Sequence, residues 1–188
     1  YGLFNGEAMK ISNIPIAFSS AMAAAIIPTV SQLVARKELA DARDKMAQAV
    51  KTIMLISIPS AVGLFVLAKP VTWLLFPDEA TIELAAKILM ALAVSVIFYA
   101  LSTLSNSILQ GVGRVNTPIV NAAIALLIQT AVMVPLLFFT DLGIYGVVIA
   151  TILYSGLMCV LNQLSLRKAL GYRQEIMNTF IVPFIASA

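Results

Sequence analysis

Long uncharged, apolar runs alternate with short polar connections along the whole chain. Five of these runs reach or approach the roughly 20 apolar residues that a helix needs to cross the hydrocarbon core of a bilayer, and a sixth stops at the last residue. The pattern therefore predicts about six membrane-spanning helices. Their approximate ranges are 11–35, 50–68, 84–111, 117–139, 143–166 and, in part, 176–188.

Composition supports the same fold class. Hydrophobic residues make up 61% of the 188 positions and charged residues 11%, whereas a soluble domain is about 45–50% apolar and roughly 25% charged. We expect an all-α, polytopic transmembrane helical bundle forming one domain over residues 1–188. Because the chain begins with Tyr1 and ends within an apolar run, we also expect it to be a fragment of a larger protein.

Cysteine and histidine usage excludes two kinds of chemistry. The single cysteine, Cys159, lies within a predicted span, so an internal disulfide is excluded, and the absence of histidine excludes a His/Cys metal site. We expect no metal, no cofactor, no catalytic residue and no nucleic-acid partner.

The basic residues predict how the spans are oriented. Of the twelve lysines and arginines, nine fall in alternate connections and three on the other side, and the positive-inside rule places the richer side in the cytoplasm. The first span then runs from outside to inside. The cytoplasmic set is Arg36, Lys37, Arg43, Lys45, Lys51, Arg114, Arg167, Lys168 and Arg173, and the outer set is Lys10, Lys69 and Lys87.

The basic connection 36–51 has a helical pattern of its own. Leu39, Arg43, Met46 and Val50 recur at helical spacing among mixed charges, which indicates a cytoplasmic amphipathic linker helix along the inner membrane face. A solvated linker helix fits the same pattern.

The stretch LQGVGRVNTP (109–118) contains two glycines and an arginine that could suggest a phosphate-binding loop. Such a loop needs a preceding buried strand in a βαβ unit, and the flanking apolar runs predict helices instead. Gly111 and Gly113 suit a helix C-terminus, while Thr117 and Pro118 suit the start of the next helix. The stretch is therefore interpreted as a tight cytoplasmic turn.

Polar residues within the spans fall on defined helix faces. One face of the third span lines up residues that could border an aqueous cavity or form hydrogen bonds between helices, and their lack of ionisable acids and bases favours hydrogen bonding. Asn121, Gln129, Asn162 and Gln163 receive the same interpretation. The residues of the third-span face are Ser95, Tyr99, Ser102, Asn106 and Gln110.

The first span differs because its polar face is also small and carries charge at the outer end. Small side chains keep a helix surface open to bulky headgroups, and Pro15 can kink the helix. Lys10 on this face fits either a cavity residue or a cation that reaches back to the outer interface. The face consists of Glu7, Lys10, Asn13, Ala17 and Ser20.

Five segments in order resemble the polysaccharide-exporter and lipid II flippase branch of the multidrug/oligosaccharidyl-lipid/polysaccharide superfamily, with stage V sporulation protein B-type members closest in character. They are IPIAFSSAMAAAIIPTVSQL (14–33), IPSAVGLFVLAKPVTWLLF (58–76), ILQGVGRVNTP (108–118), GIYGVVIATILY (143–154) and the basic connection between the first two.

The resemblance implies a parent of about fourteen helices in two lobes, of which this chain would be part of the C-terminal lobe. Such proteins carry polyprenyl-pyrophosphate-linked sugars across the cytoplasmic membrane by alternating access. Lys10 matches the position of a cavity-facing cation that other members supply as arginine, and lysine keeps the charge but loses the bidentate fork. Glu7, Asn13 and Ser20 are added from their place on the same helix face: they would complete the substrate-binding face, and Glu7, which matches no family residue, would pair with Lys10 and set its charge or couple an ion. The implied partners are the lipid-linked sugar, membrane lipids, the missing N-terminal lobe and a coupling ion, H⁺ or Na⁺.

Three other functions remain open at this point. A cation-coupled multidrug exporter of the same superfamily would need a deep carboxylate, whereas every acid except Glu7 lies in a connection or at a span end. An enzyme acting on polyprenyl lipids would need clustered acids, and the only outer cluster is Asp78, Glu79 and Glu83, which fits a solvated helix start. A structural membrane subunit is the third alternative.

Overall fold

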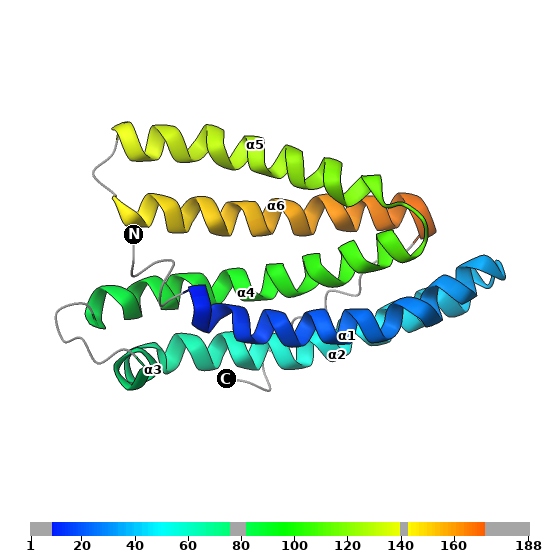
Figure 1. Cartoon of the computed structure of the whole chain (residues 1–188), viewed down its shortest axis with the longest axis horizontal. Helices are drawn as coiled ribbons and strands as arrows, with labels where there is room; N and C mark the ends of the chain where they lie inside the picture. Colours follow the sequence, from blue (N-terminus) through cyan, green and yellow to red (C-terminus); the bar gives the residue numbers. More distant parts are fainter. Residues whose placement is uncertain (1–8, 76–81, 140–142, 172–188) are drawn as a thin grey trace.

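The computed structural model describes residues 9–75, 82–139 and 143–171, and every element within these ranges is a helix (Figure 1). The five long helices are apolar enough to cross a membrane, which confirms the predicted all-α polytopic bundle. The predicted partial span 176–188 lies outside the described residues. The helices are α1 (Met9–Ala35), α2 (Leu39–Val66), α3 (Ala68–Leu75), α4 (Ile82–Gly111), α5 (Asn116–Phe139) and α6 (Ile144–Leu170).

Helix α4 occupies the centre of the bundle. It packs against α1, α2, α3 and α6, while α5 packs chiefly against α6. Of the five long helices, α4 also has the largest buried share of its apolar window. Figure 1 shows α1, α4 and α6 running in one direction and α2 and α5 in the other, as successive membrane spans require.

Two apolar clusters hold the bundle together. The larger joins α1, α2, α4 and α6 through fully buried side chains such as Met46, Ile53, Leu101 and Leu104. The smaller lies at the other end of the molecule, where Leu89 and Leu92 are among its members. Because hydrocarbon is as apolar as leucine, these contacts stabilise the bundle through close packing rather than removal from water.

The connection 36–51 does not form a separate element as predicted. Helix α2 runs without interruption from Leu39 to Val66 and so joins the linker to the second span. The linker's apolar residues Met46 and Val50 are 0% and 2% exposed in the larger core cluster, so its apolar face packs on protein instead of headgroups. The physical reason is that no glycine or proline interrupts residues 39–58.

The structure adds one helix that the apolar pattern did not predict. Helix α2 ends at Val66, the N–H of its C-cap residue Leu67 donates to the carbonyl of Gly63, and α3 begins at once with Ala68. Pro70 suits the first turn of this short helix because a missing N–H costs nothing there. The predicted outer connection after the second span is therefore partly helical.

Two of the helix–helix turns share one hydrogen-bond pattern. After α4, Gly113 has φ +82°, its N–H donates to Gln110 O at 3.0 Å, and the N–H of Arg114 donates to Leu109 O at 2.8 Å. This is a Schellman motif, in which a left-handed residue satisfies the last carbonyls of the helix. Lys37, at φ 62°, occupies the same position after α1, with Lys37 N–H to Val34 O and Glu38 N–H to Leu33 O.

The stretch 109–118 is thus a turn, as predicted, with one correction. Helix α5 begins at Asn116, so Thr117 lies inside its first turn together with Pro118 instead of capping it. Gly111 also has a role beyond ending a helix. The hydroxyl of Ser31 donates to its carbonyl at 2.7 Å, and a Cβ at Gly111 would lie 2.8 Å from Ile27 Cγ2. The missing side chain lets α1 and α4 approach closely.

Candidate functional site

Helix α1 exposes a face made of small and polar residues. Its side chains are exposed at positions spaced by three and four, which follow one side of the helix. Among the large hydrophobic residues of α1 whose side chains are described, only Phe18 is strongly exposed. The face consists of Asn13, Ala17, Ser20, Ala21, Ala24, Pro28 and Gln32.

Helix α5 is equally uncovered but has the opposite chemistry. Its exposed side chains are large and apolar, as expected for a helix against lipid, and the mean hydropathy of its span is 2.1 against 1.5 for α1. The two uncovered helices therefore expose faces of different polarity. The exposed apolar residues of α5 are Ile119, Val120, Ile124, Leu126, Leu127, Ile128, Val134, Leu137 and Phe138.

The predicted site residues are described to different extents. Asn13 and Ser20 are both exposed on the open face of α1, and the Ser20 hydroxyl donates to Ile16 O at 3.1 Å within the helix. Lys10 belongs to the first turn of α1, three residues before Asn13 and in register with the same face, but its side chain lies outside the described part. Glu7 lies outside the described residues altogether.

Buried amides link α4, α5 and α6. The Asn162 amide donates to Asn106 Oδ1 at 2.7 Å, and the Asn121 amide donates to Asn162 Oδ1 at 2.9 Å and to Ser165 Oγ at 3.0 Å. Gln163 adds a bond to Ser105 Oγ at 3.3 Å. These hydrogen bonds join the helices as predicted for Asn106, Asn121, Asn162 and Gln163. Elsewhere on the third-span face, Ser95 bonds within α4 to Leu92 O at 2.6 Å, and Gln110 is exposed.

The same face of α4 also carries an aromatic contact with α6. The rings of Tyr99 and Tyr154 are 6.3 Å apart between centroids and inclined at 47°, within the range of favourable aromatic pairs. Ser102, between Tyr99 and Asn106, is buried, and its hydroxyl has no hydrogen-bond partner among the described residues.

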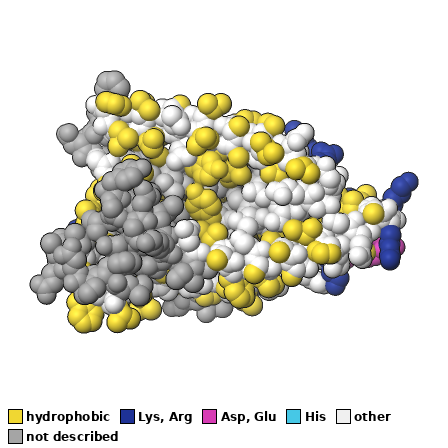
Figure 2. Space-filling view, viewed as in Figure 1, with side chains coloured by type: hydrophobic (Ala, Val, Ile, Leu, Met, Phe, Trp, Pro, Cys, Tyr) yellow, Lys and Arg dark blue, Asp and Glu magenta, His cyan; other side chains and the backbone are white. Residues whose placement is uncertain are grey.

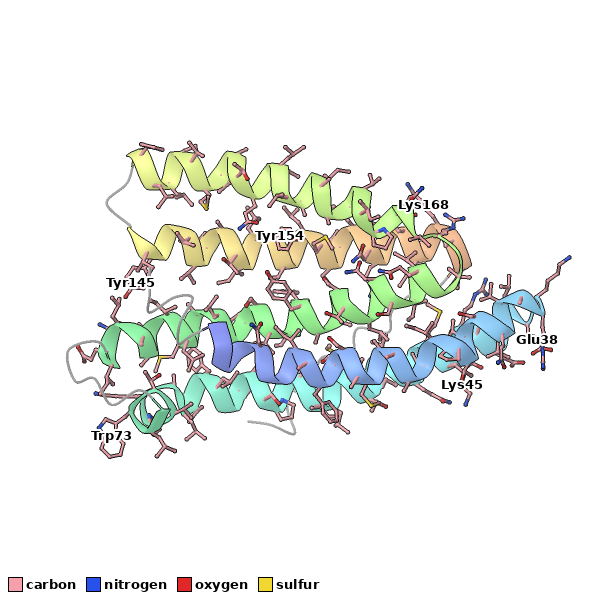
Figure 3. The ribbon with its side chains drawn as sticks, in the orientation of Figure 1. Glu38, Lys45, Trp73, Tyr145, Tyr154 and Lys168 are labelled. Atoms are coloured by element: carbon pink, nitrogen blue, oxygen red, sulfur yellow. The ribbon has the colours of Figure 1, made fainter. Side chains whose placement is uncertain are left out.

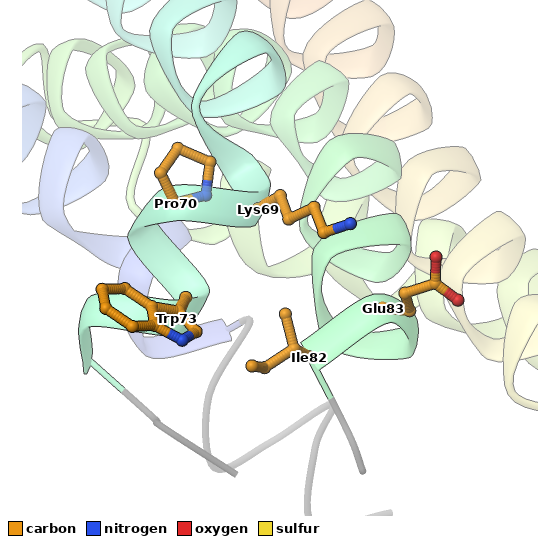
Figure 4. Close-up of a pocket in the computed structure, with 5 residues that line it drawn as sticks. All are labelled: Lys69, Pro70, Trp73, Ile82 and Glu83. Atoms are coloured by element: carbon orange, nitrogen blue, oxygen red, sulfur yellow. The ribbon is translucent and has the colours of Figure 1, made fainter. Parts of the chain in front are cut away.

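A pocket opens at the end of the bundle where α3 meets the start of α4 (Figure 4). It has a volume of about 550 Å³ and combines a cation, an indole and a carboxylate, from Lys69, Trp73 and Glu83. The sequence pattern identified Lys69 only as an outer cation and Glu83 only as part of a helix start, and it did not point to Trp73. The spacing of Lys69 and Trp73, four residues apart, was the available signal, since it places both on one side of a helix.

Charges and aromatic rings mark the two ends of the bundle. Figure 2 shows Lys and Arg gathered at the end that holds the α1–α2 turn, and Figure 3 places Glu38, Lys45 and Lys168 towards that end. Trp73 and Tyr145 lie at the opposite end (Figure 3). Such rings are enriched at membrane–water interfaces.

A family model for the lipid II flippase MurJ matches residues 8–187. The chain belongs to this family. It is 25% identical over 169 residues to the lipid II flippase MurJ of Bacillus subtilis (strain 168), covering 89% of this chain and 31% of that protein. It is 24% identical over 170 residues to stage V sporulation protein B of the same organism, covering 90% and 32%.

Membership in the MurJ family confirms the resemblance carried by the five segments. Together with the five apolar spans, it places the chain in the cytoplasmic membrane, as predicted. The chain spans about a third of the length of the curated relatives it matches. No solved structure matches it at a comparable level of significance.

Proposed function

We propose that the chain is part of a flippase that carries polyprenyl-pyrophosphate-linked sugars across the cytoplasmic membrane by alternating access, with α1 lining the substrate cavity. The lipid II flippase named among its relatives acts on a molecule of this class. In this proposal the headgroup occupies a central aqueous cavity while the lipid tail stays in the bilayer. The other wall of the cavity comes from the N-terminal lobe of the parent protein.

The open face of α1 carries the proposal. A helix facing lipid would expose large apolar side chains, as α5 does, because polar groups are costly in hydrocarbon. The α1 face instead presents Asn13, Ser20 and Gln32 among alanines. Small residues leave room for a bulky headgroup, and the amide and hydroxyl groups can bind its sugars and phosphates by hydrogen bonds.

Lys10 supplies the electrostatic part of the proposed site. It begins the face three residues before Asn13, at the outer end of the predicted outside-to-inside span. A lysine offers a point charge to a pyrophosphate without covalent chemistry. Glu7, one turn earlier in the sequence, would set the charge state of this lysine or couple transport to H⁺ or Na⁺.

The position of the acids favours an anionic cargo over a cationic drug. Within the described ranges, Glu38, Asp41, Asp44 and Glu83 all lie at or near helix ends, so none of them is a deep carboxylate for exchanging a proton with a drug. In the same ranges no group of three or more His, Cys, Asp or Glu residues could hold a metal ion. Transport by electrostatic capture of an anionic headgroup requires neither a deep carboxylate nor a metal ion.

Ligand binding to the full-length parent tests this function. Native mass spectrometry of wild type and Lys10→Ala would measure binding of undecaprenyl-pyrophosphate-linked sugar, with a lipophilic cation as competitor. Loss of one charge-assisted contact, worth about 1.5–3 kcal/mol, should weaken binding by about 10- to 150-fold. Lys10→Arg should retain binding because it keeps the charge.

Lys87→Ala is the matched control, since Lys87 is an exposed lysine near the same end of the bundle but on α4. Its binding should equal that of wild type. Equal binding by Lys10→Ala would remove Lys10 from the site. Binding of the lipophilic cation without the lipid-linked sugar would refute the flippase and favour drug export.

A further inference from the structure

A groove between α1 and α2 has a regular gradient of polarity. It has a volume of about 290 Å³, and its walls include Met22, Ile26 and Thr29 from α1 and Lys45, Gln48 and Ile53 from α2. Since the two helices are antiparallel, moving from Met22 to Thr29 and from Ile53 to Lys45 leads towards the same α1–α2 turn. The groove is therefore apolar towards the middle of the bundle and polar at the end nearest the α1–α2 turn, which is here called its mouth.

The same gradient continues past the mouth along one side of α2. Ile53, Ala49, Lys45 and Asp41 are each four residues apart, so they form a row in which each step advances about one turn of helix. Lys45 and Asp41 are exposed. The row thus presents, in order, an aliphatic chain, a methyl group, a cation and an anion.

Hydrogen-bond donors accompany the cation at the mouth. The Lys45 ammonium donates to Gln48 Oε1 at 3.3 Å, which uses the acceptor of that amide and directs its NH₂ elsewhere. Gln48 and Thr29, whose side chains carry an amide and a hydroxyl, line the groove together with Lys45. Phosphate and ester oxygens are acceptors that such donors can bind.

We propose that this α1–α2 groove binds a zwitterionic glycerophospholipid with a primary ammonium headgroup. An acyl chain lies against Met22 and Ile53, the phosphodiester is bound by Lys45 and Gln48, and the ammonium faces Asp41. Charge along the row favours this occupant: Lys45 and Asp41, one cation and one anion about one helical turn apart, match one phosphate plus one ammonium. A polyprenyl pyrophosphate carries more negative charge and lacks the ammonium that Asp41 would bind.

Lipid binding in this groove would be independent of the proposed cargo, because the ligand is a membrane phospholipid and the groove uses different residues. The groove lies between the open face of α1 and the core of the bundle, so a lipid held there would fix the spacing of α1 and α2 near their turn. We expect this lipid to stay bound whether or not the cargo is a lipid-linked sugar.

Native mass spectrometry on the full-length protein tests the proposal, with phosphatidylethanolamine and phosphatidylglycerol added in equal amounts. Wild type should retain phosphatidylethanolamine preferentially. Lys45→Met should reduce its binding about fivefold, the value expected for one interfacial lysine at about 1 kcal/mol. Asp41→Asn should shift the bound lipid towards phosphatidylglycerol, because it removes the partner of the ammonium.

Two further variants separate the groove from general charge effects. Lys168→Met removes an exposed lysine towards the same end of the bundle (Figure 3) but outside the groove, and should bind lipid as wild type does. Ala25→Leu fills the groove from an exposed position without changing charge, and should reduce binding as Lys45→Met does. Unchanged lipid binding by Lys45→Met and Ala25→Leu would overturn the site.

Two other results would also overturn the proposal. An unchanged lipid preference in Asp41→Asn would show that Asp41 does not bind the lipid ammonium. A Lys45→Met protein that keeps phosphatidylethanolamine but loses added undecaprenyl pyrophosphate would reassign the groove to the cargo.

Discussion

At the scale of the residue, Lys37 stands in a backbone conformation that favours glycine. Its φ of 62° closes the Schellman motif after α1, and a left-handed conformation costs a residue with a Cβ roughly 1–2 kcal/mol. Lys37→Gly should therefore stabilise the protein by about 0.5–1 kcal/mol once glycine's greater freedom in the unfolded chain is subtracted. Thermal unfolding in detergent, followed by circular dichroism, should show a Tm raised by about 2 °C.

Lys37→Gln separates this backbone effect from the loss of charge, because glutamine lacks the cation but keeps the Cβ. The Tm of Lys37→Gln should not exceed that of wild type. The reverse substitution, Gly113→Ala at the equivalent position after α4, should lower the Tm, since φ there is +82° with open space around the missing Cβ. A lower Tm for Lys37→Gly would contradict the left-handed assignment.

At the scale of the element, Asn162 is the junction between three helices. Its side chain is 0% exposed and bonds to both Asn106 on α4 and Asn121 on α5. Asn162→Ala would leave Asn106 and Asn121 each with one hydrogen bond fewer inside the bundle, so we expect a loss of about 1–3 kcal/mol of stability. Thermal unfolding of the purified variant should show a correspondingly lower Tm.

The exposed Gln110, one turn after Asn106 on the same helix, provides the comparison for this junction. Gln110→Ala should leave the Tm near that of wild type. Because Asn106 and Asn162 share one bond, the double variant Asn106→Ala/Asn162→Ala should lose less stability than the sum of the two single losses. Strict additivity would show that the two amides do not interact.

At the scale of the whole molecule, the asymmetry of charge predicts which end faces the cytoplasm. With Cys159 replaced by alanine, a cysteine at Val115 in the α4–α5 turn and one at Trp73 on α3 would mark opposite ends, and both native residues are more than half exposed. An impermeant maleimide should label Trp73→Cys in intact cells but label Val115→Cys only after permeabilisation. The opposite result would invert the predicted topology and place the phospholipid groove in the outer leaflet.

Neither cysteine position changes a charge, so the positive-inside signal that the experiment tests is left intact. A protein retaining only Cys159, which is 8% exposed within α6, should stay unlabelled on both sides and serves as the background control.

The sequence by itself determined the fold class, the five described spans and the family. The length of a span and the exclusion of charged residues from the hydrocarbon core are properties of a single helix in a bilayer. Both can therefore be predicted without knowing which helices pack against it. The turn at 109–118 followed from local backbone preferences in the same way. The small, polar face of α1 was also visible in the spacing of Asn13, Ala17 and Ser20, because helical periodicity fixes which residues share a side.

The tertiary structure decided everything that depends on a partner helix. It buried Met46 and Val50 and so joined the predicted linker to α2, and it assigned Gly111 to close contact with α1. It also joined Asn106, Asn121 and Asn162 into one junction and combined distant residues into the pocket at α3 and the groove between α1 and α2. Periodicity shows which side chains share a face, but packing decides whether that face meets protein, lipid or an open cavity.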